Sequence, residues 1–372
     1  MMIKNITRII LRDFHQIFGW KTDRKIIVFE SDDWGSIRLP SKEVYNRFKQ
    51  RGFSVEKSDY NRLDTLESKN DLNFLFEVLT GFKNREGVHP VFTPNMIVAN
   101  PDFKKIEESG FSTYFYEPLP ETLQRYYPKE DVFAVYRQGM DQNLFHPQFH
   151  GREHLNIHRW MKRLQERDED TLFSFQHRST YSGKSDYSFM EAFDFDSADE
   201  IDFQKEVIRD GLNLFEQLFG YRSKSFIPPC YVWDSKIENA LKEYGVETIQ
   251  GGRYQYQPTG VNEVYSKRYH YMGEMNNYGQ RFLIRNAIFE PSLFKKSDWV
   301  DYSLSTISSA FRWEKPAIIS THRINYMGSL DDKNRDATLK LLSQLLKRIV
   351  SKWPDVEFMT SDQLGDFMSN RR

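Results

Sequence analysis

Four of the nine histidines lie in one short stretch and recur every four residues: His146, His150, His154 and His158. Neutral imidazole nitrogens and carboxylate oxygens suit a divalent transition metal. Zinc in catalytic sites takes three protein ligands and leaves one position open for water. Together with an Asp-Asp pair upstream and a lone histidine downstream, the cluster predicts a metal-centred hydrolytic site.

Two pairs within the cluster could bind a metal. His150 and His154 bracket a strand-to-helix turn at Gly151, so both can point into the space above a sheet, whereas His154 and His158 would share one helix face. His146 would lie about 13 Å from His150 along a strand. Leu155 occupies the position at which the zinc-protease motif needs glutamate. His150 with His154 and His154 with His158 are therefore the two candidate ligand pairs; the alternative to both is a turn whose histidines only satisfy local hydrogen bonds.

The Asp32-Asp33 pair follows an apolar, β-branched run, the pattern of a buried strand. Adjacent residues at a strand end diverge, so one carboxylate can bind the metal while the other stands beside its water as general base. The alternative is a turn in which the aspartates bond the backbone. His322 ends another predicted strand and is the candidate general acid that protonates a leaving amine.

The elements that must position these residues alternate between strand and helix, which predicts a parallel sheet wound by right-handed crossovers. The expected strands are 25–30, 90–93, 144–149, 171–175, 226–229, 247–250, 317–320 and 356–359. The expected helices are 41–52, 71–82, 100–110, 131–140, 153–166, 198–219, 234–244, 298–311, 332–351 and a short one from 361. We expect one α/β domain over residues 25–372, with insertions at about 111–143 and 252–296.

Composition narrows the classes of partner. The chain has 372 residues with 52 Lys and Arg against 53 Asp and Glu, so its net charge gives no reason to expect nucleic acid. Cys230 is the only cysteine, which excludes an intramolecular disulfide and favours the reducing cytoplasm.

Residues 1–24 predict an amphipathic helix rather than a signal peptide or a membrane span, because charged residues interrupt the apolar run. Its residues 1–20 could lie on a membrane surface, although packing against the domain is the more common fate. The apolar side comprises Ile3, Ile6, Ile9, Ile10, Phe14, Ile17 and Phe18.

The order of these motifs resembles the polysaccharide deacetylases of the NodB-homology, carbohydrate esterase family 4 superfamily. The resemblance covers nearly the whole chain from Lys25. It is carried by the following segments: Ser31-Asp32-Asp33, His150-Gly-Arg-Glu-His154, Pro228-Pro229, Asp298-Trp299, Ile318-Ile319-Ser320-Thr321-His322 and Val356–Ser361.

The resemblance implies a distorted (β/α)7-type barrel of parallel strands and metal-assisted removal of an acetyl group, preferentially N-acetyl, from a sugar. It implies the following roles: base Asp32; metal ligands Asp33, His150 and His154; acid His322, oriented by Asp298; substrate contacts Trp34, Tyr231 and Trp299. The expected metal is Zn²⁺, with Co²⁺, Ni²⁺ and Fe²⁺ as alternatives.

Two departures from the family qualify this expectation. Ile227 stands where the family has the arginine that pairs with the base, so Arg152, Arg285 or Arg323 would have to reach in from elsewhere. The gap between Asp33 and His150 is also long, which predicts that residues 111–143 lie near the site and restrict access to it.

An intracellular chain would act on an acetylated sugar or a polysaccharide precursor, such as a nucleotide- or lipid-linked sugar. The rival readings are a metal-dependent glycoside hydrolase or amidohydrolase on the same barrel, and a sugar-binding homologue impaired by the lost arginine.

Overall fold

The computed structural model describes residues 16–184, 188–261, 264–294, 296 and 298–370. Most of the helix predicted for residues 1–24 lies outside this part, and residues 16–24 form a turn and bends rather than a helix. The other helices expected from the sequence are present, although several begin or end a few residues away. Among the described residues no helix is long and apolar enough to cross a membrane.

The strands of the main sheet all run parallel and follow the order β10-β7-β6-β5-β2-β1-β12-β11, with β13 paired to the start of β1. Their bounds are β1 Ile26–Trp34, β2 Phe92–Ile97, β5 Gln148–Gly151, β6 Ser225–Phe226, β7 Thr248–Gly251, β10 Arg281–Ile284, β11 Ala287–Ile288, β12 Ala317–His322 and β13 Glu357–Phe358. Their side chains form the main core, which explains why β1 and β12 are continuous apolar runs.

The two ends of this sheet are joined by consecutive residues of the chain. β10 pairs with β7, and β11, which begins three residues after β10 ends, pairs with β12. Between them the Arg285 amide donates to the Gly251 carbonyl at 2.9 Å, and the Asn286 amide donates to the Ile318 carbonyl at 3.2 Å. Residues 281–288 therefore act as one strand that closes a distorted barrel, and the predicted (β/α)7-type fold is confirmed.

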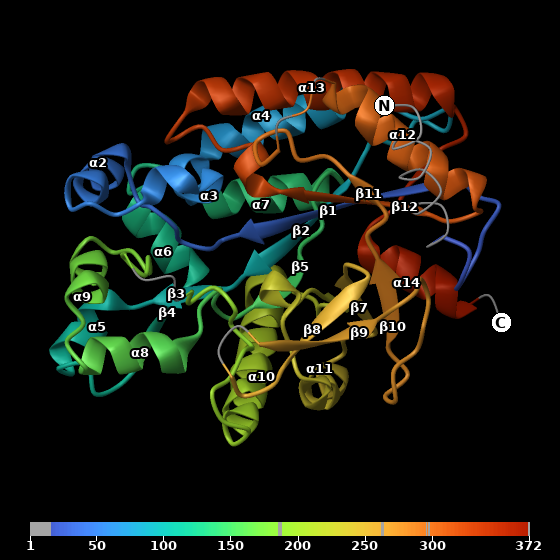
Figure 1. The fold of residues 1–372 in the computed structure, drawn as a ribbon. Helices are drawn as coiled ribbons and strands as arrows, with labels where there is room; N and C mark the ends of the chain where they lie inside the picture. Colours follow the sequence, from blue (N-terminus) through green and yellow to red (C-terminus); the bar gives the residue numbers. More distant parts are fainter. Residues whose placement is uncertain (1–15, 185–187, 262–263, 295, 297, 371–372) are drawn as a thin grey trace, which may run out of the picture.

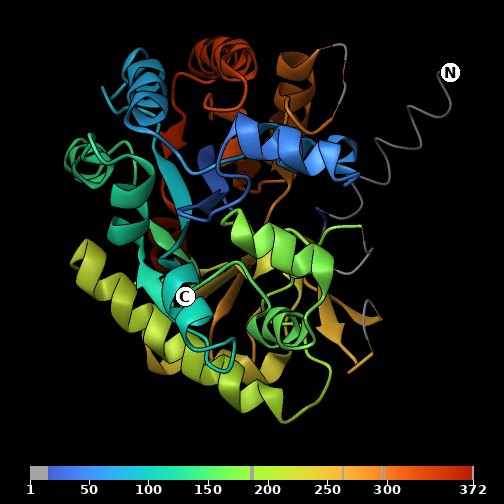
Figure 2. The same cartoon turned by 90° about the vertical axis from the view of Figure 1, so that its left-hand side faces the viewer.

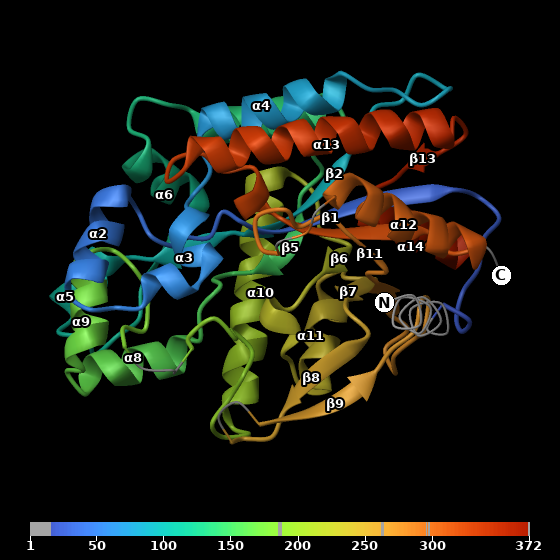
Figure 3. The ribbon, with the colours of Figure 1, turned by 45° about the horizontal axis from the view of Figure 1, so that its top comes forward.

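Helices surround the barrel, and α4 and α13 lie side by side over one face (Figures 1 and 3). The helix bounds are α2 Lys42–Gln50, α3 Asp59–Leu63, α4 Lys69–Thr80, α5 Phe103–Glu108, α6 Leu119–Tyr126, α7 Val132–Asp141, α8 Ile157–Gln165, α9 Glu169–Gln176, α10 Glu200–Phe219, α11 Glu238–Glu243, α12 Trp299–Arg312, α13 Asp332–Lys352 and α14 Ser361–Asn370. Figure 2 looks toward the carboxyl end of β1, where α2, α8 and α9 lie in front of the strands.

Two predicted elements are wrong. Residues 171–175 form part of α9 rather than a strand, because the Asp168 side chain caps that helix by accepting the amide of Thr171. The proposed insertion at 252–296 is also too long, since β10 and β11 belong to the barrel. Among the described residues of this stretch, β8 (Tyr254–Pro258) and β9 (Tyr265–Tyr269) form an antiparallel hairpin that is separate from the main sheet.

The insertion at 111–143 contains the short strand β4 (Tyr116–Pro118), which pairs with β3 (Ala99–Pro101), and helices α6 and α7. The helix predicted at 131–140 is confirmed as α7. The Tyr116 hydroxyl donates to Asp210, which also accepts from Arg152. Through this shared contact with Asp210, the insertion is linked to the loop that follows β5.

Candidate functional site

The end of β1 carries two adjacent carboxylates that face the same cavity. The pairing of β1 with β2 shifts register between Ser31 and Trp34, and Asp33 has φ of 74°, in the left-handed region. Bulges and positive φ at a non-glycine residue are uncommon and concentrate near functional sites. The bulge turns Asp33 so that both Asp32 and Asp33 line one cavity, although neighbours in a regular strand would point apart.

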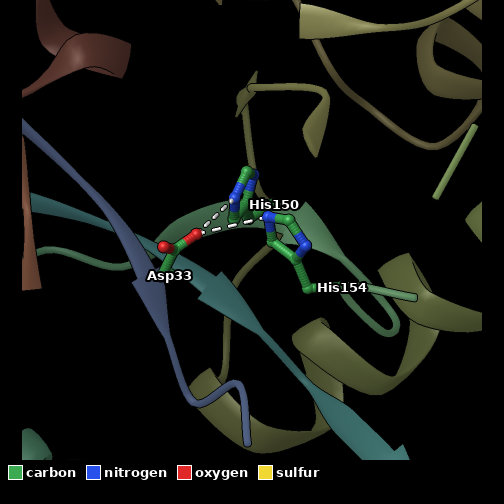
Figure 4. A group of neighbouring side chains, drawn as sticks. All are labelled: Asp33, His150 and His154. Atoms are coloured by element: carbon green, nitrogen blue, oxygen red, sulfur yellow. Dashed lines mark ion pairs between the residues drawn. The ribbon is translucent and has the colours of Figure 1, made fainter. Parts of the chain in front are cut away.

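Asp33, His150 and His154 converge as the sequence predicted (Figure 4). Asp33 Oδ1 lies 3.5 Å from His150 Nε2 and 3.3 Å from His154 Nε2, and all three side chains are buried. His150 Nδ1 donates to the Ile227 carbonyl at 2.8 Å, which leaves the Nε2 lone pair directed at Asp33. Such a bond on the second ring nitrogen is the usual way to orient a metal-binding histidine.

The donor set fits a divalent transition metal. His150 Nε2 is buried without a hydrogen-bond partner among the described residues, so a cation between the three groups would satisfy it. Burial lowers the pKa of His154 to about 4, which keeps its imidazole neutral and able to bind metal. Two nitrogens and one carboxylate oxygen leave coordination positions for water, as in catalytic zinc sites.

Asp32 lies beside this group and is held by Arg285. The guanidinium donates from Nη1 to Oδ2 at 2.6 Å and from Nη2 to Oδ1 at 2.7 Å, and its Nε donates to Glu30 at 2.7 Å. Asn95 Nδ2 donates to Asp32 Oδ1 at 2.7 Å. Burial by itself would raise the pKa of Asp32, but Arg285 more than offsets it and holds that pKa at about 2. Asp32 is therefore a fixed, ionised carboxylate.

His322, at the end of β12, faces Asp32 and is held by Glu290. Its Nε2 lies 3.6 Å from Asp32 Oδ2, and its Nδ1 donates to Glu290 Oε1 at 2.5 Å. Asn325 donates to the other oxygen of Glu290 at 2.7 Å. Although burial lowers the pKa of His322, the Glu290 carboxylate raises it to about 9, so the imidazole is protonated at neutral pH.

The role expected for Asp298 is corrected by this arrangement. Asp298 is the N-cap of α12, where it accepts the amide of Asp301 at 2.8 Å. It lines a second cavity with Lys296 and Trp299 rather than the one that contains His322. Glu290 holds the position beside His322 that the resemblance gave to Asp298.

A Glu290→Gln variant should lower the pKa of His322 toward the ordinary histidine value of about 6.5, because the neutral amide no longer stabilises the imidazolium. Imidazole chemical shifts followed by NMR against pH measure this directly, with His146 as an internal control. The contact stabilises the wild-type fold fully below pH 6.5, and this contribution is lost as pH rises through about 9. An unchanged His322 titration would contradict the role of Glu290.

The cavity above these groups has a volume of about 560 Å³. Beyond the acidic and imidazole groups, Arg38 lines the cavity. The start of α3 and the segments 180–182 and 188–191 form its walls, with the residues Ser58, Tyr60, Asn61, Thr180, Tyr181, Ser182, Ser188, Phe189, Met190 and Glu191. Arg38 donates to Asp33 Oδ2 at 3.2 Å, so the second oxygen of Asp33 is also fixed. No residue of 111–143 lines this cavity, so the expected position of that insertion at the entrance is corrected.

The three residues predicted to contact the substrate lie in three different surroundings. Tyr231 lines the cavity, where its hydroxyl accepts from Arg285 Nη1 at 3.2 Å. Trp299 is buried, donates its indole N–H to the Phe294 carbonyl and faces the second cavity. Trp34 is fully buried, with its indole N–H on Ser31 Oγ at 2.9 Å and its ring against Phe145. The predicted substrate roles of Trp34 and Trp299 are therefore wrong, because both rings belong to the packing.

A Trp34→Ala variant is expected to lose about 3–5 kcal/mol of unfolding free energy, the usual cost of removing a large buried aromatic side chain. Chemical denaturation measures this loss. Phe294→Ala, which removes an exposed ring, is the matched control and should change stability little. A Trp34→Ala protein of wild-type stability would show that this ring does not carry core packing.

The outer histidines of the cluster make other contacts. His146 Nε2 lies 3.2 Å from Asp362, and its ring stacks on Tyr221. His158 lies 3.0 Å from Glu200 and stacks on Phe203. The alternative pairing of His154 with His158 at a metal is not supported by these positions.

Sequence reasoning missed Glu290 and Arg38. Glu290 follows the apolar stretch 287–289, so the rule that found Asp32 and His322, a polar residue after a buried strand, could have found it. Arg285 was one of three candidates for the missing arginine, and it is the one that reaches Asp32. Arg323 instead pairs with Asp64 and Glu67.

Solved structures with a similar fold share little sequence with this chain. A 4-alpha-glucanotransferase from Thermococcus litoralis is 11% identical with a TM-score of 0.46, and the match covers 94% of this chain and 41% of that one. A branching enzyme from Thermococcus kodakaraensis is 12% identical with a TM-score of 0.47, covering 94% and 72%. A peptidoglycan deacetylase from Bacillus subtilis is 11% identical with a TM-score of 0.37, covering 94% and 93%.

Comparison with protein-family models gave no match, and comparison with the curated proteins gave none either. Because the three TM-scores lie below 0.5, we base neither a family nor an activity on them.

Proposed function

We propose that this protein is a metal-dependent hydrolase that removes an acetyl group, preferentially N-linked, from a sugar. The observation that carries the proposal is the presence of three groups in one cavity: the Asp33, His150 and His154 donors, an ionised Asp32 and a protonated His322. Zn²⁺ is the metal best suited to two imidazoles and one carboxylate, with Co²⁺, Ni²⁺ and Fe²⁺ as alternatives.

A bound metal would polarise the acetyl carbonyl and lower the pKa of water. The residues of the chain supply the proton transfers. Asp32 accepts a proton from the attacking water, and Arg285 and Asn95 hold its carboxylate in place. His322 carries the proton that the departing amine requires, and Glu290 keeps it charged until then. Tyr231 and the polar cavity walls bind the sugar.

The contacts of Asp32 count against the hypothesis that the protein is a sugar-binding homologue with impaired catalysis. That hypothesis was based on Ile227, which occupies the position where the family has the arginine that pairs with the base. Arg285 supplies a guanidinium bonded to both oxygens of Asp32 from a different strand, so the chemical requirement is met. The rival glycoside hydrolase needs a carboxylate acid at the glycosidic oxygen, whereas here the proton donor opposite the base is an imidazole.

The test measures two products from the same reaction. Purified protein loaded with Zn²⁺ is incubated with N-acetylated and O-acetylated sugars and oligosaccharides, and both acetate and new reducing ends are quantified. Acetate without new reducing ends supports the proposal. New reducing ends would support a glycoside hydrolase, and bound metal with neither product from any sugar would support the impaired homologue.

A further inference from the structure

Only one of the two carboxylate oxygens of Asp33 faces the histidines, and both dashed lines in Figure 4 leave from it. The other oxygen, Oδ2, accepts a hydrogen bond from Arg38 Nη2 at 3.2 Å. Arg38 Nε in turn lies 3.4 Å from Asp64 Oδ2. Asp33 is therefore one end of a series of acidic and basic side chains that continues away from the cavity.

The series ends in the interior of the protein. Arg323 donates to both oxygens of Asp64, from Nε at 2.9 Å and from Nη2 at 3.2 Å, and its Nη1 donates to Glu67 Oε2 at 2.8 Å. The Tyr136 hydroxyl donates to the other oxygen of Glu67. Asp64 and Glu67 lie between α3 and α4, Arg323 follows β12, and all three side chains are fully buried. We call Arg38, Asp64, Glu67 and Arg323 the ion-pair network.

The network also holds the backbone that follows Asp33. Glu67 Oε1 accepts the amide of Gly35 at 2.8 Å. Asn100 fixes the same turn, because its Oδ1 accepts the Ile37 amide at 3.0 Å and its Nδ2 donates to the Gly35 carbonyl at 2.9 Å. The left-handed conformation of Asp33 is costly for a non-glycine residue and persists only where the surrounding contacts fix it. The chain itself therefore fixes both the backbone and the side chain of Asp33.

Stability alone is a poor explanation for four acidic and basic side chains in this position. Removing charged groups from water is costly, and replacing a buried ion pair with apolar residues of similar volume is often neutral or stabilising. A fully connected polar network does hold its members in one arrangement. Here the side chain at its end is a candidate metal ligand, and metal ligands are commonly oriented by such outer partners.

We propose that the ion-pair network positions Asp33 for metal binding and thereby sets the metal affinity of the site. The inference rests on the metal centre of the proposed function. Arg38 holds Oδ2 of Asp33, so that Oδ1 stays turned toward His150 and His154. Asp64 holds Arg38, and the rest of the network holds Asp64. The network acts through Asp33 and needs no contact with the substrate.

The experiment measures the Zn²⁺ affinity of the full-length, metal-free protein by competition with a chromophoric chelator, without any substrate. Arg38→Lys keeps the positive charge but cannot contact Asp33 and Asp64 at once, because lysine lacks the planar fork of donors. It should bind Zn²⁺ about 10- to 100-fold more weakly than wild type, the usual effect of losing such a partner. Asp64→Asn removes the carboxylate that holds Arg38 and should weaken binding by about the same factor.

The matched control is Arg335→Lys. Like Arg38, the Arg335 side chain is 13% exposed and pairs with a fully buried aspartate, which is Asp71 in this case. Arg335 does not line the candidate cavity, so this variant should bind Zn²⁺ like wild type. Thermal unfolding of the metal-free proteins verifies that each variant is folded.

Arg38→Met separates the effect of position from that of charge. Weaker Zn²⁺ binding by Arg38→Met supports the proposal, whereas tighter binding than wild type would show that Arg38 acts by repelling the cation and would overturn it. Wild-type affinity in folded Arg38→Lys and Asp64→Asn, or an equal loss in Arg335→Lys, also overturns it and leaves the proposed function standing. A wild-type protein that binds no Zn²⁺ overturns the proposed function as well.

Discussion

If the proposed function holds, an Asp33→Ala variant is expected to lose bound divalent metal and to release acetate about a thousandfold or more slowly than wild type. Asp33 is the only carboxylate among the three converging donors, and two neutral imidazoles alone bind a dication weakly. A metal held by Asp33, His150 and His154 would contribute several kcal/mol of transition-state stabilisation, and each 1.36 kcal/mol corresponds to a factor of ten in rate. Metal content by mass spectrometry and acetate release measure the two losses independently.

The histidines provide a matched pair for the same experiment. His150→Ala should lose metal as Asp33→Ala does, whereas His158→Ala should retain it, because His158 contacts Glu200 and Phe203 instead. Metal retained by His150→Ala and lost by His158→Ala would reverse the ligand assignment. Loss of metal can also be followed without activity, through the unfolding temperature of each variant with and without added Zn²⁺.

An Asp32→Asn variant should keep its metal but lower kcat by a factor of about 10² to 10⁴, the usual contribution of a positioned general base. Asparagine has the shape of aspartate and cannot accept the proton. The low pKa of Asp32, about 2, means that the wild-type base remains ionised throughout the neutral and mildly acidic range. Acetate release against pH, together with metal content, tests this prediction.

Asp298→Asn is the control for that variant, because asparagine caps a helix as well as aspartate does and Asp298 lies outside the cavity. It should be nearly as active as wild type. Loss of metal from Asp32→Asn would make Asp32 a ligand rather than the base. A large loss of activity in Asp298→Asn would restore the role that the family resemblance gave to it.

The sequence predicted the parts of the site that depend on local pattern. A polar pair after an apolar run located the end of β1, and a histidine after another run located the end of β12. Because the carboxyl ends of parallel strands meet at one end of a barrel, those residues had to come together. The turn at Gly151 made His150 and His154 a candidate ligand pair beside His154 and His158, and the family resemblance favoured the first pair.

The partners of those residues could not be predicted in the same way. Arg285 is 253 positions from Asp32 in the chain, and no local pattern distinguishes its guanidinium from those of Arg152 and Arg323. Trp34 was misassigned because a tryptophan beside a site looks the same in sequence whether it faces the cavity or the core. The bulge between Ser31 and Trp34 decides this, since it turns Asp33 toward the cavity and leaves the indole in the core.

The position of Arg285 makes the reactivity of Asp32 depend on the closure of the barrel. The residue that neutralises Asp32 and Glu30 lies at the point where residues 281–288 change partner from β7 to β12. Local opening at residues 281–288 would leave the carboxylates of Asp32 and Glu30 buried without the Arg285 cation, so the free energy of the opened form is high. In that form Asp32 would also lose the guanidinium that keeps it ionised. The hydrogen-exchange rates of the Arg285 and Asn286 amides would therefore measure the fraction of molecules in which these residues are closed and Arg285 holds Asp32.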